Sequence, residues 1–388
     1  MGHHLGSKSS IVPLIDRLNK YPIGLVDNEK LRQILTLLFS EKEAFIASRF
    51  PLEEATLPEL TRLTRIAPER LEPILSRMAD KGLVMDLPYG EKTYYLLVPG
   101  LIGFFEFTFM KQRADLPVTE LARLMHDYLH DDPENGQAKE FFGSKTQLTR
   151  SIPYEEHIPV SSTITTYESA RDIIRNADFG AVGICYCRHK KEHLDQQCEK
   201  GAPVEGICIS LGTGARFLVR RGFAKQKSTQ ELLAVIDHAR DLNLTHITDN
   251  IRHNPSFICN CCSCCCELLA GIHSGYQDGV AKARYTLQLD EQACTDCGFC
   301  VKACNARALM MRGEHKQRLN LLQEICLDCG ACITNCQKQA LSLRPALRSK
   351  PPQKKSDLFL RILREKKRLK PFVIGRIKKI AFSPFVQK

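Results

Sequence analysis

Two stretches in the last third of the 388-residue chain repeat one spacing of cysteines. Each reads C-x2-C-x2-C-x3-C, and together they contain eight of the 18 cysteines. Thiolates are soft ligands that suit zinc, copper and iron–sulfur centres. Zinc sites usually combine two separated C-x2-C pairs, whereas here a third cysteine recurs at the same interval, which favours iron–sulfur. The cysteines are Cys294, Cys297, Cys300, Cys304, Cys326, Cys329, Cys332 and Cys336.

This repeat resembles the bacterial two-cluster ferredoxins. The resemblance implies a ferredoxin-like (βαβ)2 module with two [4Fe–4S] clusters. In such a module the fourth cysteine of each stretch binds the cluster of the other stretch. The implied ligands are Cys294, Cys297, Cys300 and Cys336 for one cluster, and Cys326, Cys329, Cys332 and Cys304 for the other. Because thiolates bind every iron, we expect the module to transfer electrons and to do no bond chemistry.

The chain departs from the ferredoxin pattern directly after each fourth cysteine. Asn305 in the first half and Gln337 in the second stand where a proline is usual. Proline is not a ligand, so the implied cluster binding is unaffected. The additional backbone N–H can form hydrogen bonds near sulfur, and such bonds tune the potential of a cluster.

The other ten cysteines indicate a second metal centre. Six of them fall within eight positions, which is too dense for isolated buried thiols, and disulfides between near-adjacent residues would be strained. The neighbouring repeat favours one or two additional iron–sulfur clusters here. By sequence proximity the first group is Cys185, Cys187, Cys198 and Cys208. The second group is Cys259, Cys261, Cys262, Cys264, Cys265 and Cys266.

Ten thiols leave several arrangements open. They can supply two four-iron clusters with two thiols left over, one larger or asymmetric cluster, or one ordinary cluster with a redox-active dithiol. Arg188 can offset the negative charge of a thiolate cluster, and His189 or His193 can act as a ligand or proton donor. The alternative is a solvated basic loop with Lys190 and Lys191.

The N-terminal part has a different pattern. Apolar residues at helical spacing predict a helix over 29–49, and two shorter helices follow over 57–66 and 69–81, before two strands around a turn. This order resembles the winged helix-turn-helix family over residues 29–98. The last helix mixes acidic and basic side chains and lacks the surplus of cations that phosphate binding needs. A docking or dimerisation role is therefore favoured over DNA binding, which stays an alternative.

The net charge of +11 is concentrated at the C-terminal end. Residues 344–388 contain 15 basic and 2 acidic residues interleaved with apolar ones. Such a tail can lie on an anionic membrane surface, dock on an acidic partner, or remain solvated. The sequence shows neither a secretion signal nor an apolar run of membrane-spanning length. We therefore expect a cytoplasmic protein, with peripheral attachment to the inner face of the membrane as an option.

Together these patterns predict an α+β multidomain protein. The segments are an N-terminal segment (1–28), a winged-helix-like domain with a helical extension (29–150), an α/β cysteine-rich middle domain (151–284), the two-cluster module (285–343) and the basic tail (344–388). The layout over about residues 20–343 resembles a family of prokaryotic 4Fe-4S ferredoxin-type proteins. That resemblance implies electron transfer with a redox partner protein. Alternatives are a reductase with an active-site cluster in Cys259–Cys266 and a redox-sensing winged-helix regulator.

Overall fold

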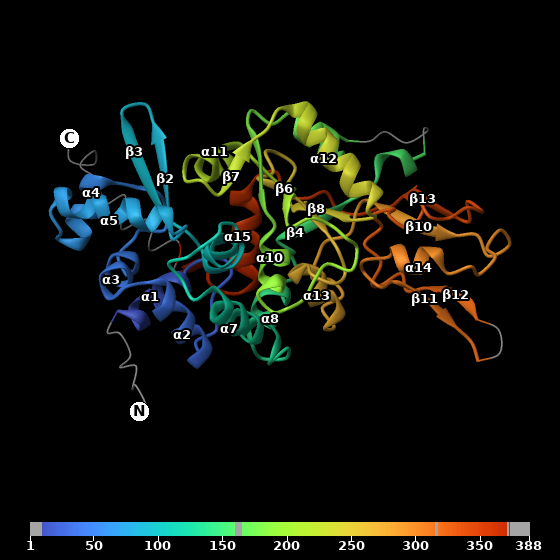
Figure 1. Cartoon of the computed structure of the whole chain (residues 1–388), viewed down its shortest axis with the longest axis horizontal. Helices are drawn as coiled ribbons and strands as arrows, with labels where there is room; N and C mark the ends of the chain where they lie inside the picture. Colours follow the sequence, from blue (N-terminus) through green and yellow to red (C-terminus); the bar gives the residue numbers. More distant parts are fainter. Residues whose placement is uncertain (1–9, 160–164, 315–316, 371, 373–388) are drawn as a thin grey trace. The chain divides into compact units, whose positions relative to one another are not determined.

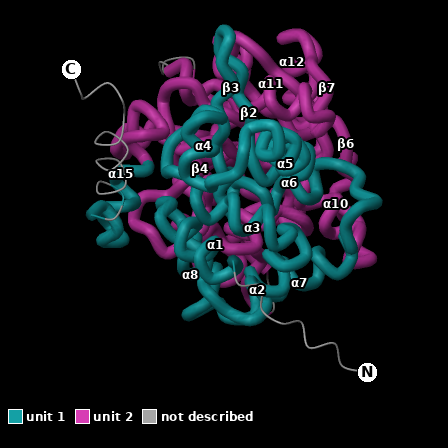
Figure 2. Tube along the Cα trace, turned by 90° about the vertical axis from the view of Figure 1, so that its left-hand side faces the viewer, with its two compact units in different colours: residues 1–141, 359–388 teal, residues 142–358 magenta. Residues whose placement is uncertain are grey.

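The computed structural model describes residues 10–159, 165–314, 317–370 and 372. The chain divides into two compact units (Figure 2): residues 1–141 with 359–388 form the first, and residues 142–358 form the second. The first unit therefore combines both ends of the chain. The second unit contains all 18 cysteines.

The first unit begins with three helices: α1 (Ile11–Leu18), α2 (Glu29–Leu38) and α3 (Glu41–Ser48). The prediction of one helix over 29–49 is therefore wrong. Phe39 is extended, and Ser40 caps α3 in a reciprocal capping box with Glu43. The S-x-x-E pattern that marks such a start is present in the sequence, and its capping bonds favour a new helix over continuation.

A small sheet and two further helices follow. Strand β1 (Ala55–Thr56) precedes α4 (Leu57–Thr64) and α5 (Pro68–Asp80), and β2 (Val84–Tyr89) and β3 (Lys92–Leu97) form a hairpin. The antiparallel sheet has the order β1-β3-β2. Both helices and the hairpin lie where the sequence pattern predicts them. Gly82, at φ +75°, makes the left-handed turn between α5 and β2.

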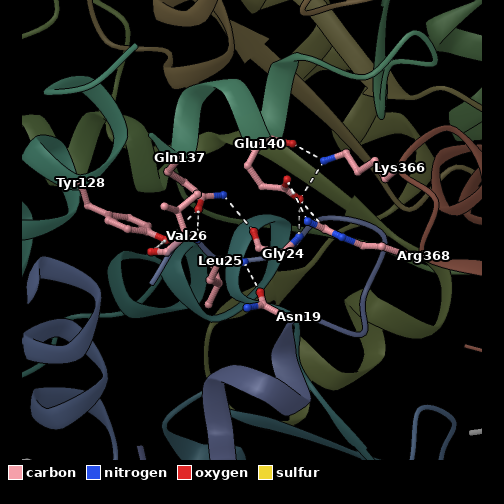
Figure 3. Close-up of polar contacts among 9 residues, drawn as sticks. All are labelled: Asn19, Gly24, Leu25, Val26, Tyr128, Gln137, Glu140, Lys366 and Arg368. Atoms are coloured by element: carbon pink, nitrogen blue, oxygen red, sulfur yellow. Dashed lines mark hydrogen bonds and ion pairs between the residues drawn. The ribbon is translucent and has the colours of Figure 1, made fainter. Parts of the chain in front are cut away.

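The rest of the first unit contains α6 (Phe105–Phe109), α7 (Val118–His130) and α8, which spans Gln137–Phe142 and so ends just beyond the unit boundary. Glu140 binds the C-terminal segment (Figure 3): its Oε1 accepts hydrogen bonds from Gly24 N (2.8 Å), Lys366 Nζ (2.8 Å) and Arg368 Nη1 (2.6 Å). Burial raises the pKa of Glu140, but the bonds from Arg368 and Lys366 outweigh it, so the pKa lies below 4.5. Residues 371 and 373–388 of the predicted basic tail lie outside the described residues.

A six-stranded sheet forms the centre of the second unit. Its order is β4-β8-β9-β6-β5-β7, and all neighbouring strands are antiparallel. The strands are β4 (Thr149–Ile152), β5 (Gly180–Ile184), β6 (Glu205–Leu211), β7 (Ala224–Gln226), β8 (Thr245–Asp249) and β9 (Phe257–Cys261). The helices are α9 (Ala170–Arg175), α10 (Tyr186–Glu192), α11 (Gly212–Arg220), α12 (Thr229–Asp241) and α13 (Glu267–His273). Apolar residues of α9 and α12 pack against β5, β6 and β9, which fixes the strand ends that carry cysteines.

The ferredoxin-type part of the second unit contains two short, separate pairs of strands. Figure 1 shows β10 beside β13 and β11 beside β12, and both pairs are antiparallel. The elements are β10 (Tyr285–Leu289), α14 (Phe299–Ala303), β11 (Leu309–Arg312), β12 (Arg318–Leu321) and β13 (Leu341–Pro345). In the second half, residues 331–335 form turns where the first half has α14.

The last described helix is α15 (Lys355–Glu365). Among the described residues, every helix is too short or too polar to cross a membrane.

Candidate metal centres

The two cysteine loops of the module have the same backbone geometry. Asp296 and Asp328 follow the first cysteine of each loop by two positions, and both have a positive φ, 55° and 54°. Gly298 and Gly330 follow them, also at positive φ. Each loop turns back on its first cysteine, since Asp296 N donates to Cys294 Sγ (3.5 Å) and Asp328 N donates to Cys326 Sγ (3.4 Å). The repeat in sequence is therefore a repeat in shape.

The charge of the fourth cysteine of each stretch acts on the third cysteine of the other loop. Burial raises the pKa of Cys300 to about 11, and the next cause is the charge of Cys336. Burial likewise raises the pKa of Cys332, followed by the charge of Cys304. These charges lie close enough to act across the two loops, as the crossed ligand sets require. That these two sets bind clusters is a proposal, taken up below.

Backbone N–H groups also point at both fourth cysteines. Ala308 N donates to Cys304 Sγ (3.3 Å), and Ala340 N donates to Cys336 Sγ (3.2 Å). Such bonds favour a thiolate and raise the potential of the cluster that it binds. The alanine of the Ala-Leu pair that follows each stretch therefore donates a hydrogen bond to the fourth cysteine in both halves.

The ten middle cysteines separate into a group of four and a group of six. In the first group, which we call the quartet, all Sγ atoms lie within 4.8 Å of one another. The distances from Cys198 Sγ to the Sγ atoms of Cys262 and Cys264 are 3.6 and 3.8 Å, and Cys264 and Cys265 are 3.6 Å apart. Both groups predicted by sequence proximity are wrong: Cys198 lies with Cys262, Cys264 and Cys265 from the loop after β9, and Cys259, Cys261 and Cys266 do not belong to that group.

The remaining six thiols, here called the ring, shift one another's pKa in a closed circle of pairs. The pairs are Cys185 and Cys187, Cys187 and Cys266, Cys266 and Cys261, Cys261 and Cys259, Cys259 and Cys208, and Cys208 and Cys185. The Cys266–Cys261 separation is 3.1 Å, and all 18 cysteines of the described chain are free thiols. No three ring sulfurs among the described residues lie within 4.8 Å of one another, so the ring is wider than the quartet.

The direction of the pKa shift alternates around the ring. Hydrogen bonds from two neighbouring thiols lower the pKa of Cys185, Cys266 and Cys259, that of Cys259 to about 6. Burial, followed by bonds to its neighbours, raises the pKa of Cys187, and bonds to neighbours, followed by burial, raise those of Cys208 and Cys261. A soft cation bound to these sulfurs competes with their protons, because metal binding needs the thiolate form.

The strands explain why the ring closes. Cys259 and Cys261 are two apart on β9, so their side chains lie on one face of the sheet, and Asn260 points to the other. Asn260 is fixed there by His246 Nδ1 (2.6 Å) and by donating to Ile207 O (2.6 Å). Cys208 comes from the neighbouring β6. Cys185 is the N-cap residue of α10, and Cys187 lies in the first turn of that helix.

Arg188 lies between the two groups of thiols. It is 2% exposed, and its Nη2 donates to Asn260 O (3.0 Å) and to Cys262 Sγ (3.4 Å). Burial lowers its pKa, but the charges of Cys185, Cys262 and Cys208 outweigh burial and raise it. Its Nε and Nη1 are buried without a hydrogen-bond partner in the described chain. Buried unsatisfied donors are costly, and an anionic sulfur centre would supply the acceptors, so the residues present fit such a group.

The alternative of a solvated basic loop is wrong for this segment. His189 and Lys190 are buried beside Arg188, and Lys190 Nζ forms an ion pair with Glu267 (2.5 Å), the residue after Cys266. His193 is half-buried, and burial lowers its pKa. Lys190 is paired with a carboxylate, whereas the described contacts of Arg188 are to a carbonyl and to thiols. The positive charge of Arg188 is therefore directed at sulfur.

Asn305 joins the module to the quartet. It is 1% exposed, donates to Asn243 O (2.6 Å) and Thr245 Oγ1 (3.1 Å), and accepts from Ser263 N (3.3 Å). Ser263 lies between Cys262 and Cys264, and Asn305 directly follows Cys304. Gln337, in the equivalent position of the second half, is exposed. The asparagine in place of the usual proline marked this position in the sequence, but the sequence did not predict that its side chain binds Ser263 N.

Thr245 makes a second connection between the middle part and the module. Its Oγ1 lies 3.7 Å from Cys329 Sγ, and the backbone N–H of Tyr154 donates to Cys329 O (2.9 Å). Ring cysteines Cys261 and Cys266 also share one apolar core with module cysteines. Cys261 and Cys266 are therefore packed with the module in one apolar core, whereas the quartet and the other buried ring cysteines belong to a separate core.

Residues 293–340 match the family model of the 4Fe-4S dicluster domain. This match and the cysteine groups define an iron–sulfur protein with a ferredoxin-type domain and an electron-transfer role. The match is confined to the module and leaves the rest of the chain unassigned. Neither the comparison with curated proteins nor the comparison with solved structures gave a significant match.

Proposed function

We propose that the protein is an electron carrier in which two [4Fe–4S] clusters exchange electrons with a sulfur-ligated centre in the middle part of the second unit. The proposed ligands of the clusters are the two sets that the loops bring together. One set is Cys294, Cys297, Cys300 and Cys336; the other is Cys326, Cys329, Cys332 and Cys304. The bound clusters supply one-electron redox chemistry. The chain positions them, excludes water and tunes their potentials.

The contact of Asn305 with Ser263 carries this proposal. One covalent step leads from Cys304 to Asn305, and one hydrogen bond leads from Asn305 to Ser263, the neighbour of Cys262. Arg188 binds Cys262 Sγ and also faces the ring cysteines Cys185 and Cys208, so the route continues to the ring whichever ion the quartet binds. A module that served only an external partner would gain nothing from a buried polar joint to another thiol group. The shared apolar core supports the same route, because it brings the ring cysteines Cys261 and Cys266 into one cluster with module cysteines.

The exposed end of the module suits a redox partner protein. Cys297 is the exposed member of its set, and Phe299, two residues on, is 49% exposed. A partner that covers this apolar side chain would approach the first cluster directly. Electrons would then pass from the first cluster to the second and on to the middle centre.

The test is an anaerobic titration of the reconstituted full chain, with electron paramagnetic resonance spectra recorded at each step. We expect two cubane signals that interact, and rapid redistribution of electrons to the middle centre after a reductant pulse. The variant Cys329→Ser should interrupt this redistribution, whereas Cys297→Ser should remove only the first cluster. Iron-free protein after reconstitution, or reduced clusters that never exchange electrons with the middle centre, would refute the proposal.

The six-thiol ring favours a second candidate, an iron–sulfur reductase. Six thiols exceed what one ordinary cluster uses, so a centre there can present an iron or a thiol to a substrate. The sign of this activity is substrate-dependent reoxidation of the reduced protein that is lost in Cys261→Ala. A carrier without such activity keeps the same reoxidation rate with and without substrate.

For the first unit we propose a docking role on a winged-helix-like scaffold. Lys81, at the end of α5, is bound to Glu43 (2.8 Å), so it is occupied within the protein. Glu140 likewise binds Lys366 and Arg368 of the basic tail. Fewer cations are therefore free for DNA or for an anionic membrane. A redox-dependent shift of DNA fragments at moderate salt would instead favour the regulator, and binding to anionic vesicles would favour a peripheral membrane protein.

A further inference from the structure

We propose that Cys198, Cys262, Cys264 and Cys265 form a closed tetrahedral site for one metal ion, Zn²⁺ or Fe²⁺, and not a further four-iron cluster. This inference goes beyond the proposed electron transfer, because it assigns a different kind of centre to four of the ten middle cysteines.

The sulfur spacing fits a single ion. Metal–thiolate bonds to zinc are about 2.3 Å long, so neighbouring sulfurs of a regular tetrahedron lie about 3.8 Å apart. The measured separations are 3.6, 3.8 and 3.6 Å. All four sulfurs lie within 4.8 Å of one another, as ligands of one ion must.

The module provides an internal reference for a cubane. Each thiolate of a cubane binds a different iron, so its ligands must stand further apart than those of one ion. Among the described residues, the quartet is the one all-cysteine group with ligand atoms this close together. The module sets, whose family binds cubanes, are wider. The same chain therefore presents two different sulfur spacings.

The loop after β9 is shaped to present three ligands within four residues. Cys262 O accepts from Cys266 N (3.2 Å), which closes the turn, and Ser263 N is bound by Asn305. Cys198 comes from the loop after α10, where Gly201 N donates to Cys198 O (3.0 Å). Both segments are fixed by backbone bonds that do not depend on a metal, so the site is preorganised.

Arg188 partly balances the charge of a one-ion site. Four thiolates and one divalent cation leave two negative charges. The guanidinium of Arg188, which is 3.4 Å from Cys262 Sγ and also contacts Cys198, offsets one of them. Four thiolates leave no open coordination position, which is typical of structural zinc and of one-electron iron sites. The ring then remains as the only group of middle-domain thiols in the described chain for a polynuclear centre.

The test uses Cys198→Ser in the anaerobically prepared full chain, with zinc, iron and acid-labile sulfide measured per chain. A one-ion site contains no inorganic sulfide. We therefore expect the loss of one metal ion with unchanged sulfide. The matched control Ser263→Ala keeps the backbone N–H and should keep both. Loss of several irons together with sulfide, or no loss of metal, would overturn the proposal.

If the Cys198→Ser protein does not fold, a second measurement on the wild-type protein tests the same proposal. Anomalous diffraction from wild-type crystals at the zinc and iron edges should show one peak equidistant from the four sulfurs, and the edge identifies the metal. Several peaks there, or none, would overturn the proposal. The proposed electron-transfer clusters are tested separately with Cys297→Ser, which should lose iron and acid-labile sulfide together.

Discussion

Replacing Asn305 with alanine should loosen the joint between the module and the quartet. The side chain makes three hydrogen bonds, to Asn243 O, Thr245 Oγ1 and Ser263 N, and it is 1% exposed. A net contribution of about 1 kcal/mol for each bond gives about 3 kcal/mol. Since 1.4 kcal/mol is a factor of ten, local opening should become roughly 100-fold more frequent.

The assay is the rate at which a strong chelator removes iron from the anaerobic protein, followed by the loss of visible absorbance. The second cluster, which Cys304 would bind, should bleach first in Asn305→Ala, because its loop opens with the joint. Electron exchange with the middle centre should slow in parallel, since the Ser263 contact lies on the proposed route.

The matched control is Gln337→Ala, the equivalent position of the other half. Gln337 is exposed, and substitutions at such sites change stability by about 0.5 kcal/mol or less. Its iron loss should equal that of the wild type. If Asn305→Ala and Gln337→Ala bleach at the same rate, the joint contributes nothing and the reasoning is refuted.

Three further predictions concern buried charges. Arg188→Gln removes a cation beside Cys262. Since a hydrogen bond to a charged group contributes about 1.5–3 kcal/mol, the reduction potential of a redox-active middle centre should fall by roughly 60–130 mV. A redox titration measures this fall, and an unchanged potential would exclude this role of Arg188. Lys190→Met breaks the buried pair with Glu267 and should lower thermal stability by about 3–5 kcal/mol, whereas Lys191→Met, whose Nζ bond to Gln196 is exposed, should match the wild type. The pKa of Glu140 is lowered from 4.5, so the carboxylate stabilises the 366–368 segment above pH 4.5 and this stabilisation is lost as the pH falls through the lower pKa of the folded state. Hydrogen exchange of the segment should show that loss. Glu140→Gln should abolish the pH dependence.

The elements of the first unit were predictable where a periodic pattern and a strong stop signal coincide. Helices α4 and α5 and the β2–β3 hairpin lie within a few residues of the expected ranges because Pro68 and Gly82 mark local conformations. The predicted helix over 29–49 failed because its apolar spacing continues through a cap at Ser40. Periodicity reports which face is buried, but hydrogen bonds at a cap decide where a helix stops.

The metal-binding cysteines of the module could be predicted from the sequence because most of them are close together in the chain. Three cysteines of each loop are close in sequence, and the repeat of their spacing argues against a zinc site. The match of residues 293–340 to the 4Fe-4S dicluster domain agrees with this prediction. By contrast, the density of middle cysteines indicated metal binding without indicating which thiols share a centre.

The sequence by itself determined that this is an iron–sulfur protein, because ligand spacing within a short loop depends on only a few backbone torsions. Only the tertiary structure decided that Cys198 joins the quartet while Cys208 joins the ring, since that choice depends on how strands β5, β6 and β9 pair across many residues. It also decided that Arg188 is buried among thiols and that Asn305 reaches Ser263. Distances between segments remote in sequence are set by the packing of the whole unit, which no local pattern encodes.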